Sequence, residues 1–401
     1  MIVGVAKEVF PGERRVAMVP TIVPSLTKAG LEVIVEPGAG LDAGYPDEAY
    51  TEKGAKIAAG RDEVFQADVV LQVRTAGAAG EQAASDQGRT KSGSVVIGMA
   101  DPLGSPEVAQ QAAGNGATLF ALELLPRITR AQSMDVLSSM ATIAGYRAVL
   151  LAATTLPKMF PMMMTAAGTI APAKVFVVGA GVAGLQAIAS AKRLGAVVSA
   201  YDVRPAVKEQ VESLGGKFLE IEMDTAGAED KGGYAKQLDD EAIRKQQEMM
   251  LQAVAESDVV ITTAAVPGKK APILITAEMV RKMAPGSVVV DLAAERGGNC
   301  ELTKPGETVV DGGVSILGPA NLPAEIPFHA SQMYAKNIAT FLLNMIDDGQ
   351  LKLDLEDEIV RDTLVAHDGK IANARVAEAL GIEIETPPAA DAKADDTEEA
   401  E

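Results

Sequence analysis

The sequence predicts an α/β protein with two domains, each built on a doubly wound parallel sheet, and with a cleft between them. Three observations favour this fold. The chain has 401 residues, which suits two or three domains at roughly 100–200 residues each. Short apolar runs alternate with helical stretches along most of it, as in parallel sheets whose strands are joined by helices. Its 38 glycines suit the tight turns of such folds.

The first third of the chain contains the apolar runs of a first sheet. Strands are predicted at residues 2–6, 32–36, 69–73, 94–99 and 118–122. Helices are predicted at residues 21–29 and 47–56, and the polar, Gly/Ala-rich stretch 79–93 predicts a loop. Residues 133–151 predict one long helix, whose start Ser133 or Asp135 is suited to cap. Such a helix would connect two domains.

A second α/β unit begins at Lys174. Strands are predicted at residues 175–178, 196–201, 259–263, 287–292 and 314–316, with a helix at 182–194. A long helix at 329–345 is expected to lead back to the first domain. We therefore predict one domain from residues 1–136 plus 330–382 and a second from 137–329. Residues 383–401 are expected to form a flexible acidic tail, since residues 381–401 hold eight acidic residues and one lysine.

Composition excludes several classes of protein. The net charge of −19 argues against nucleic-acid binding, which requires a basic face. Cys300 is the only cysteine, so no intramolecular disulfide can form, and a reducing, cytoplasmic compartment is expected. The apolar run at the N-terminus is too short for a signal peptide. The most apolar stretch, residues 148–156, is shorter than the roughly 20 residues that a membrane helix needs, so no membrane span is predicted.

The strongest local signal is a glycine motif that follows one predicted strand and opens a helix. Gly179 permits a tight turn, Gly181 lets the backbone approach a pyrophosphate, and Gly184 allows close packing of helix on strand. The N-terminus of the helix, which starts near Val182, offers N–H groups to the phosphates. This pattern predicts a Rossmann-like dinucleotide site, and its alternative is a Gly-rich turn with a purely structural role.

The end of the next predicted strand indicates which nucleotide binds. Asp202 follows Gly184 by 18 residues, near the spacing at which an acidic side chain binds the adenosine ribose. Its carboxylate would repel a 2′-phosphate and so favours NAD over NADP. Arg204 argues weakly in the other direction, because an arginine can accept that phosphate.

A second group of polar residues lies at the start of the long predicted helix. Arg127 and Asp135 are spaced so that they could pair and hold the intervening loop. Gln132 and Ser138 offer neutral donors and acceptors that suit a carboxamide or a ribose. By spacing alone, a polar helix start with its capping residues explains the same pattern.

Together these motifs resemble the NAD(H)-binding component of the proton-translocating nicotinamide nucleotide transhydrogenases. The resemblance extends from Lys7 to about Gly381. It includes the two motifs above and five further blocks, at residues 162–169, 208–218, 232–236, 262–272 and 291–299. Matching blocks spread over most of the chain are much more specific than a single glycine motif.

The resemblance implies a function and a set of partners. Hydride would pass directly from NADH on this component to NADP on a second component, coupled to proton translocation through a membrane component. The resemblance also implies a homodimer, and a peripheral position reached through the partners. In some family members this component continues into membrane helices. Because this chain ends at Glu401, we expect a complex divided over separate polypeptides.

The resemblance also assigns residues to parts of the nucleotide. It implies that Arg127, Gln132, Asp135 and Ser138 lie near the nicotinamide and serve hydride transfer, and that Gly179, Gly181, Val182 and Gly184 hold the pyrophosphate. The adenosine end would be bound by Asp202, Val203 and Arg204. A loop that closes over the nucleotide would contain Gly233 and Tyr234. Further contacts would come from Gln246 and Ala265. Direct hydride transfer needs close, dry positioning and no acid or base on the protein. The isolated His329 and His367 form no metal pattern.

Two alternatives remain. Alanine dehydrogenase is related, and Arg15 matches the arginine that grips its substrate carboxylate, whereas Arg74 stands where its substrate lysine would fall. Its catalytic histidine would fall at Met99, which cannot transfer a proton, and its catalytic aspartate at Glu295. The other alternative is a non-catalytic NAD(H)-sensing module. The loop 127–138 argues against it, because a sensor has less need to order the reactive ring of the nucleotide.

Overall fold

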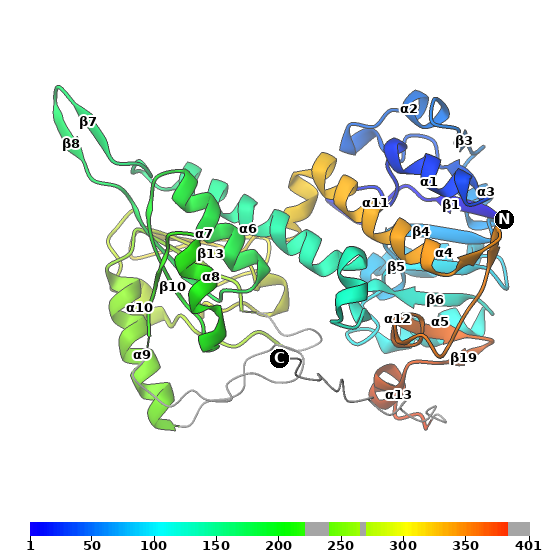
Figure 1. Cartoon of the computed structure of the whole chain (residues 1–401). Helices are drawn as coiled ribbons and strands as arrows, with labels where there is room; N and C mark the ends of the chain where they lie inside the picture. The colour runs from blue at the N-terminus through cyan, green and yellow to red at the C-terminus, as the bar shows by residue number, and fades with distance from the viewer. Residues whose placement is uncertain (221–239, 265–269, 384–401) are drawn as a thin grey trace, which may run out of the picture.

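The computed structural model describes residues 1–220, 240–264 and 270–383 (Figure 1). These residues form two α/β domains around separate sheets, and a long helix runs from one to the other. The expected acidic tail, 383–401, therefore lies outside the described residues apart from Glu383.

The first sheet has eight strands in the order β19-β18-β6-β5-β4-β1-β2-β3. Strands β1 to β6 are parallel, and their order 3-2-1-4-5-6 is that of a doubly wound fold. β18 and β19 add an antiparallel edge from the C-terminal part of the chain. The strands are β1 (Ile2–Val5), β2 (Glu32–Val35), β3 (Lys56–Ile57), β4 (Val69–Arg74), β5 (Val95–Met99), β6 (Thr118–Ala121), β18 (Leu364–His367) and β19 (Lys370–Ile371).

Helices cover both faces of this sheet, and each face has its own hydrophobic core. They are α1 (Val23–Lys28), α2 (Asp47–Thr51), α3 (Arg61–Phe65), α4 (Ala83–Arg89), α5 (Pro106–Gly114), α11 (Pro327–Asn344), α12 (Glu358–Thr363) and α13 (Ala374–Leu380). The long C-terminal helix predicted at 329–345 is therefore confirmed as α11, which packs into the core that also contains β1 and β4.

Two predictions in this domain were wrong. The predicted loop at 79–93 contains helix α4, because the carboxylate of Asp86 pairs with Arg61 on α3 (2.6 Å) and anchors a segment with little apolar patterning. The predicted helix at 47–56 ends at Thr51. Gly54 has φ +93°, which a helix cannot accommodate, and the chain then enters β3.

The second sheet has the order β11-β10-β9-β12-β13-β15-β14, parallel except for the edge strand β14. Its strands are β9 (Lys174–Val178), β10 (Val197–Tyr201), β11 (Lys217–Phe218), β12 (Val259–Thr262), β13 (Val288–Asp291), β14 (Thr308–Asp311) and β15 (Val314–Leu317). Helices α7 (Val182–Arg193), α8 (Lys208–Ser213), α9 (Asp240–Ala255) and α10 (Ala277–Arg281) pack around it. The order again reverses beside the first strand, between β9 and β12, where a doubly wound sheet opens a crevice.

Helix α6 (Val136–Thr155) connects the domains. Its first half, including Met140 and Ile143, packs in the first domain's core, and Ala148 and Ala152 pack in the second. The chain returns through the 3₁₀ turn η8 (Leu322–Glu325), which lies against α6. The predicted helix at 133–151 thus starts three residues later, with Asp135 as its N-cap.

Among the described residues, α6 is also the one helix whose length and composition would suffice to cross a membrane. Its packing in two cores accounts for that composition, so the helix is weak evidence for a span. Two small hairpins complete the structure. β16 (Ile346–Asp347) pairs with β17 (Gln350–Leu351). β7 (Met163–Thr165) and β8 (Gly168–Ile170), which were not predicted, project from the second domain (Figure 1).

We expect Gly145→Ala to destabilise the protein. Gly145 lies where α6 crosses α7, and a Cβ there would stand 2.1 Å from the carbonyl oxygen of Ala183. Overpacking of this kind costs about 1–3 kcal/mol in the free energy of unfolding, measured by urea titration. The matched control is Gly88→Ala in α4, where a Cβ meets nothing within 4 Å, so the gain in helix propensity should stabilise the protein instead. Equal stability of the Gly145 variant and the wild type would contradict this packing.

Candidate functional site

A glycine turn joins β9 to α7 at the point where the strand order reverses. Gly179 has φ +95°, a conformation that favours glycine. A Cβ on Gly184 would lie 1.9 Å from the carbonyl oxygen of Gly179, so the helix can pack this closely only on glycine. A Cβ on Gly181 would meet nothing within 4 Å. The turn is therefore tight on its inner side and open at Gly181.

The open side of the turn carries the N-terminus of α7. Gly181 is the N-cap of this helix, and no side chain caps it by a hydrogen bond. Val182, the first helical residue, is 41% exposed. An uncapped helix N-terminus presents N–H groups and a partial positive charge, which together suit a phosphate group.

Asp202 lies directly beside this turn, at the end of β10. Its Oδ2 accepts a hydrogen bond from the backbone N–H of Ala180 (2.7 Å). Arg204 donates from Nε to Oδ1 (2.9 Å) and from Nη2 to Oδ2 (2.9 Å), and Val203 packs against the core beneath. The carboxylate is thus held at the turn, in a position to accept hydrogen bonds from a ribose if Arg204 gives way.

The segment after β12 forms the other wall of the turn and is fixed by a polar network. Thr263 donates from Oγ1 to the carbonyl oxygen of Gly179 (3.0 Å). Asn299 holds this segment with its amide, accepting from Ala264 N–H (3.0 Å) and donating to the carbonyl oxygens of Ala264 (2.8 Å) and Pro272 (2.8 Å). Asp291, fully buried at the end of β13, accepts from the N–H of Asn299 (2.7 Å). These three residues shape the site, although the sequence motif alone assigned them no role.

The loop predicted to hold the nicotinamide lies at the start of α6. Residues Thr129–Met134 form the 3₁₀ turn η5, in which Gln132 is exposed. Asp135 caps α6 by accepting from Ser138 N–H (2.9 Å) and Ser138 Oγ (2.5 Å). As the N-cap, Asp135 directs its carboxylate to the first turn of the helix, and among the described residues no ion pair joins it to Arg127.

Helix packing relates this loop to the glycine turn. α6 crosses the start of α7 at Gly145 and Ala183. Ser138 precedes Gly145 by two turns, or about 10 Å along the helix at 1.5 Å per residue. The loop therefore extends beyond the N-terminus of α7, on the side of the first domain. Of the other predicted contacts, Gly233, Tyr234 and Ala265 lie outside the described residues, and so does the side chain of Gln246 on α9.

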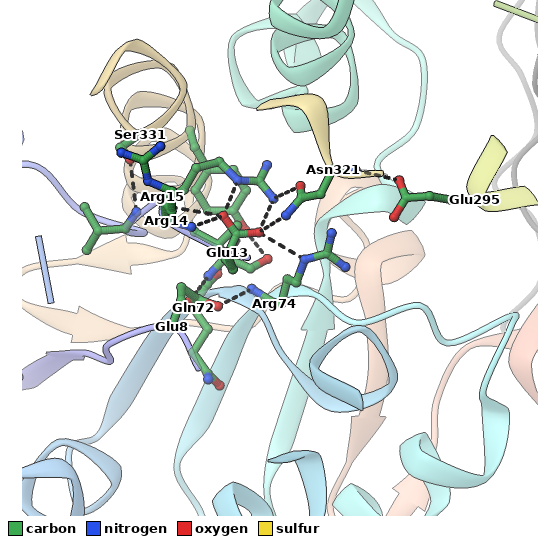
Figure 2. A network of polar contacts seen from close by, with 12 residues as sticks. Glu8, Glu13, Arg14, Arg15, Gln72, Arg74, Glu295, Asn321 and Ser331 are labelled. Carbon is green, nitrogen blue, oxygen red and sulfur yellow. Dashed lines mark hydrogen bonds and ion pairs between the residues drawn. The ribbon is translucent and has the colours of Figure 1, made fainter. Parts of the chain in front are cut away.

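A second polar cluster lies at the matching point of the first sheet, between the ends of β1 and β4 (Figure 2). The buried Arg15 and Glu13 form a bidentate pair, with Nε–Oε1 at 2.7 Å and Nη2–Oε2 at 2.6 Å. Arg74 donates from Nε to the same carboxylate (3.0 Å). Glu8 accepts from the N–H groups of Val73 (2.6 Å) and Arg74 (3.1 Å).

The two carboxyl groups of this cluster have opposite pKa shifts. Burial raises the pKa of Glu8 to about 8, and the charge of Glu13 adds to that effect. Burial also acts to raise the pKa of Glu13, but the hydrogen bonds and charge of Arg15 outweigh it and lower the pKa to about 2. The cluster therefore holds Arg15 and Glu13 as a charged pair and keeps Glu8 protonated at neutral pH.

This cluster bears on the alanine dehydrogenase alternative. Arg15, which matches a substrate-binding position of that enzyme, is 2% exposed and already paired with Glu13. Met99 ends β5 and offers no proton, and Glu295 is exposed, accepting from Asn321 N–H (3.3 Å). Within residues 1–220, 240–264 and 270–383, no group of three or more His, Cys, Asp or Glu is placed to hold a metal ion. Arg15 is thus occupied by an internal ion pair, and methionine stands where that enzyme's catalytic histidine would fall.

The raised pKa of Glu8 predicts how stability depends on pH. The unfolded carboxyl group ionises near pH 4.5 and the folded one near pH 8, so only the folded state keeps the proton between these values. The free energy of unfolding should therefore fall as pH rises from about 4.5 to 8. Glu8→Gln should flatten this decline in urea titrations. A smaller decline should remain, because burial also raises the pKa of Glu123, to about 7. The exposed control Glu48→Gln should keep the wild-type slope, and an unchanged slope in Glu8→Gln would contradict the assignment.

Known proteins resemble this chain over nearly its whole length. The N-terminal domain of the alanine dehydrogenase/PNT family matches residues 4–144, and the C-terminal domain matches residues 148–374. An NAD(P) transhydrogenase alpha subunit of Rhodospirillum rubrum is 49% identical over 377 residues, covering 93% of this chain and 98% of the relative. Alanine dehydrogenase of Bacillus subtilis is 29% identical over 391 residues, covering 96% of each.

A solved structure agrees with both the fold and the relationship. The crystal structure of transhydrogenase from Sinorhizobium meliloti has a TM-score of 0.84 and 49% sequence identity, covering 92% of this chain and 100% of that chain. The predicted two-domain α/β fold and the resemblance to the transhydrogenases are therefore confirmed. The chain belongs to the alanine dehydrogenase/PNT family, and within it to the NAD(P) transhydrogenase alpha subunits.

Proposed function

We propose that this chain is the NAD(H)-binding subunit of a proton-translocating transhydrogenase, and that it passes hydride directly from NADH to NADP+ on a partner component. The observation that carries this proposal is the 49% identity to a transhydrogenase alpha subunit, which covers 98% of that relative. The open glycine turn adds a physical reason, since Gly181 and the uncapped start of α7 suit a pyrophosphate.

The nucleotide held by this chain is NAD(H), and NADP(H) belongs to the partner component. Asp202 supports this division, because its carboxylate lies at the glycine turn, where the adenosine ribose of a bound nucleotide would be expected. A 2′-phosphate there would meet a negative charge. Its pairing with Arg204 lowers that repulsion.

The site lies between two domains, residues 1–136 with 330–382 and residues 137–329. The separation of the hydrophobic cores supports a division into two domains, with the first half of α6 (Met140, Ile143) packed in the first domain's core. One core contains strands of the first sheet with helix α11, and another contains β9, β12 and α7. α6 passes from one core to the other, so the nicotinamide loop at its start belongs to the first domain and the pyrophosphate turn to the second.

The bound nicotinamide supplies the hydride, and the protein's task is to orient the ring. Arg127, Gln132 and Ser138 hold its carboxamide and ribose, with Asp135 fixing Ser138 through two hydrogen bonds. We assign the remaining nucleotide contacts to Val182, Val203, Gly233, Tyr234, Gln246 and Ala265. No acid or base is required, in agreement with Met99 at the end of β5. The chain reaches the membrane only through its partners, as a peripheral cytoplasmic subunit.

The reaction itself provides the test. Purified chain, the NADP(H)-binding component of a related transhydrogenase, NADH and thio-NADP+ are mixed, and reduction of the thio-analogue is followed by absorbance. Reduction that needs both proteins supports the proposal. Reduction of pyruvate with ammonium by the chain alone would indicate an alanine dehydrogenase, and NADH binding without any turnover would indicate a sensor.

Gln132→Asn should slow hydride transfer in this assay while leaving NADH affinity nearly unchanged. Gln132 is exposed on η5, so shortening it by one methylene disturbs no core and moves only the amide that orients the ring. A loss between about 10-fold and 100-fold in rate is expected from misplacement alone. NADH affinity is measured by fluorescence titration, and a variant that loses binding would contradict this role for Gln132.

We propose further that the chain is a homodimer and that the β7–β8 hairpin contributes to the interface. All residues of both strands are exposed, and Met162, Met164 and Ile170 are 58%, 79% and 41% exposed. An isolated two-stranded hairpin is marginally stable in water, and a patch of exposed apolar side chains marks an interaction surface. A second copy of the chain is the occupant that the family resemblance implies.

Met164→Glu should therefore weaken the dimer. A carboxylate at the most exposed methionine of the hairpin would lose its hydration on burial against an apolar surface. Light scattering at micromolar concentration should give a lower mass than the wild type. Leu41→Glu, at an equally apolar and 61% exposed position in the first domain, is the matched control and should stay dimeric. A dimeric Met164 variant would remove the hairpin from the interface.

A further inference from the structure

Asn321 joins the two domains at the polar cluster of the first sheet. Its Nδ2 donates to Oε2 of Glu13 (2.9 Å), and its Oδ1 accepts from Nη2 of Arg15 (3.2 Å). Its backbone N–H donates to Oε2 of Glu295 in the second domain (3.3 Å). Figure 2 shows the side chain between the Glu13–Arg15 pair and Glu295. Asn321 thus belongs to the second domain, and its side-chain amide binds a buried ion pair of the first domain. We call this contact of Asn321 with Glu13 and Arg15 the clasp.

The chemistry of the clasp suits an amide side chain. Glu13 needs a donor and Arg15 needs an acceptor, and a neutral amide supplies both without adding charge to a buried pair. Asn321 also has φ +51°, a left-handed conformation that asparagine tolerates better than most residues. The residue type therefore satisfies both the backbone and the cluster.

Asn321 occupies the segment by which the chain returns from the second domain to the first. It follows β15 and directly precedes η8, whose Glu325 pairs with Arg147 of α6 (2.6 Å). The two interdomain connections are therefore tied together at η8. Next to this junction, the side chain of Asn321 contacts the end of the first sheet, where the side chains of Glu13 and Arg15 are fully or nearly fully buried.

A second contact between the domains provides a comparison. Arg296 donates from Nη2 to Oδ1 of Asp101 (2.8 Å), but their side chains are 47% and 30% exposed. Water screens such a pair, and exposed ion pairs contribute little. The hydrogen bonds of Asn321 reach a buried ion pair, so they are the less screened of these two polar contacts and add to the packing of α6 in both cores.

We propose that Asn321 is a positioning residue for hydride transfer. By clasping Glu13 and Arg15 it fixes the second domain, with its glycine turn, relative to the first domain, with its nicotinamide loop. The nicotinamide then stays at one distance and angle from the partner component. The kinetic part of this inference rests on the proposed transhydrogenase function, whereas the structural part does not.

The variant that tests the clasp is Asn321→Gly. Glycine accepts the left-handed φ without strain, so only the side-chain amide is lost, whereas alanine would add strain at this backbone position. Asn344→Ala is the matched control, because its amide donates to Asp357 within the first domain (3.1 Å). Arg296→Ala removes the exposed interdomain pair and is the second control.

The structural readout is the distance between spin labels on the two domains, measured by pulsed electron resonance. Labels are placed on Glu107→Cys in α5 and Lys282→Cys after α10, both exposed positions. The native Cys300 is buried, and burial raises its pKa to about 11, so it reacts slowly with the label. Asn321→Gly should broaden or shift the distance distribution, and both controls should keep that of the wild type.

The kinetic readout separates positioning from binding. In the reconstituted assay, Asn321→Gly should slow hydride transfer at saturating NADH by about 10-fold or more, with NADH affinity within about threefold of the wild type. An unchanged distance distribution overturns the inference, whether or not the wild type transfers hydride. A changed distribution with a normal transfer rate overturns the positioning role. If the wild type itself fails to transfer hydride, the proposed function fails, and the distance measurement still decides whether Asn321 is the clasp.

Discussion

The arrangement of the site depends on one steric constraint, the close approach of helices to backbone at glycine. α7 starts so near β9 that Gly184 has no space for a side chain against the carbonyl oxygen of Gly179. This contact directs the uncapped helix N-terminus over the crevice of the second sheet. α6 in turn crosses α7 at Gly145, against the carbonyl of Ala183, and carries the loop of Gln132 and Ser138 past the same turn. Two glycine contacts therefore relate the parts of the chain that would hold opposite ends of a dinucleotide.

The two sheets have the same strand order around their first strand, yet they use the resulting crevice differently. In the second sheet, the end of β9 turns on glycines and leaves open space at Gly181. In the first sheet, the corresponding crevice is filled by the protein's own charges, since Glu8 accepts from the end of β4 and Glu13 neutralises the buried Arg15. One crevice is thus available to an anionic ligand, and the other serves as a rigid anchor that Asn321 can reach from the second domain.

Much of this could be predicted from the sequence because it depends on local patterns. The buried strands appear in the sequence as runs of valine and isoleucine. The glycine motif marks both the tight turn after one strand and the start of the helix that follows it. Helix α4 and the β7–β8 hairpin were missed because little apolar periodicity marks them, and α4 is held by a distant ion pair between Asp86 and Arg61. The roles of Asn299 and Asn321 could not be predicted either. Asn299 acts on a segment that lies 35 residues away and Asn321 on one 308 residues away, and no local pattern encodes such contacts.

Isotope transfer can show whether this chain gives hydride directly to NADP+ on a partner. NADH deuterated at C4 is mixed with the chain, the NADP(H)-binding partner component and NADP+, and the NADPH formed is analysed by mass spectrometry. Direct transfer predicts that the deuterium transferred from NADH appears in NADPH without exchange with water, and only when both proteins are present. Loss of the label to solvent, or NADPH formation by the chain alone, would contradict it.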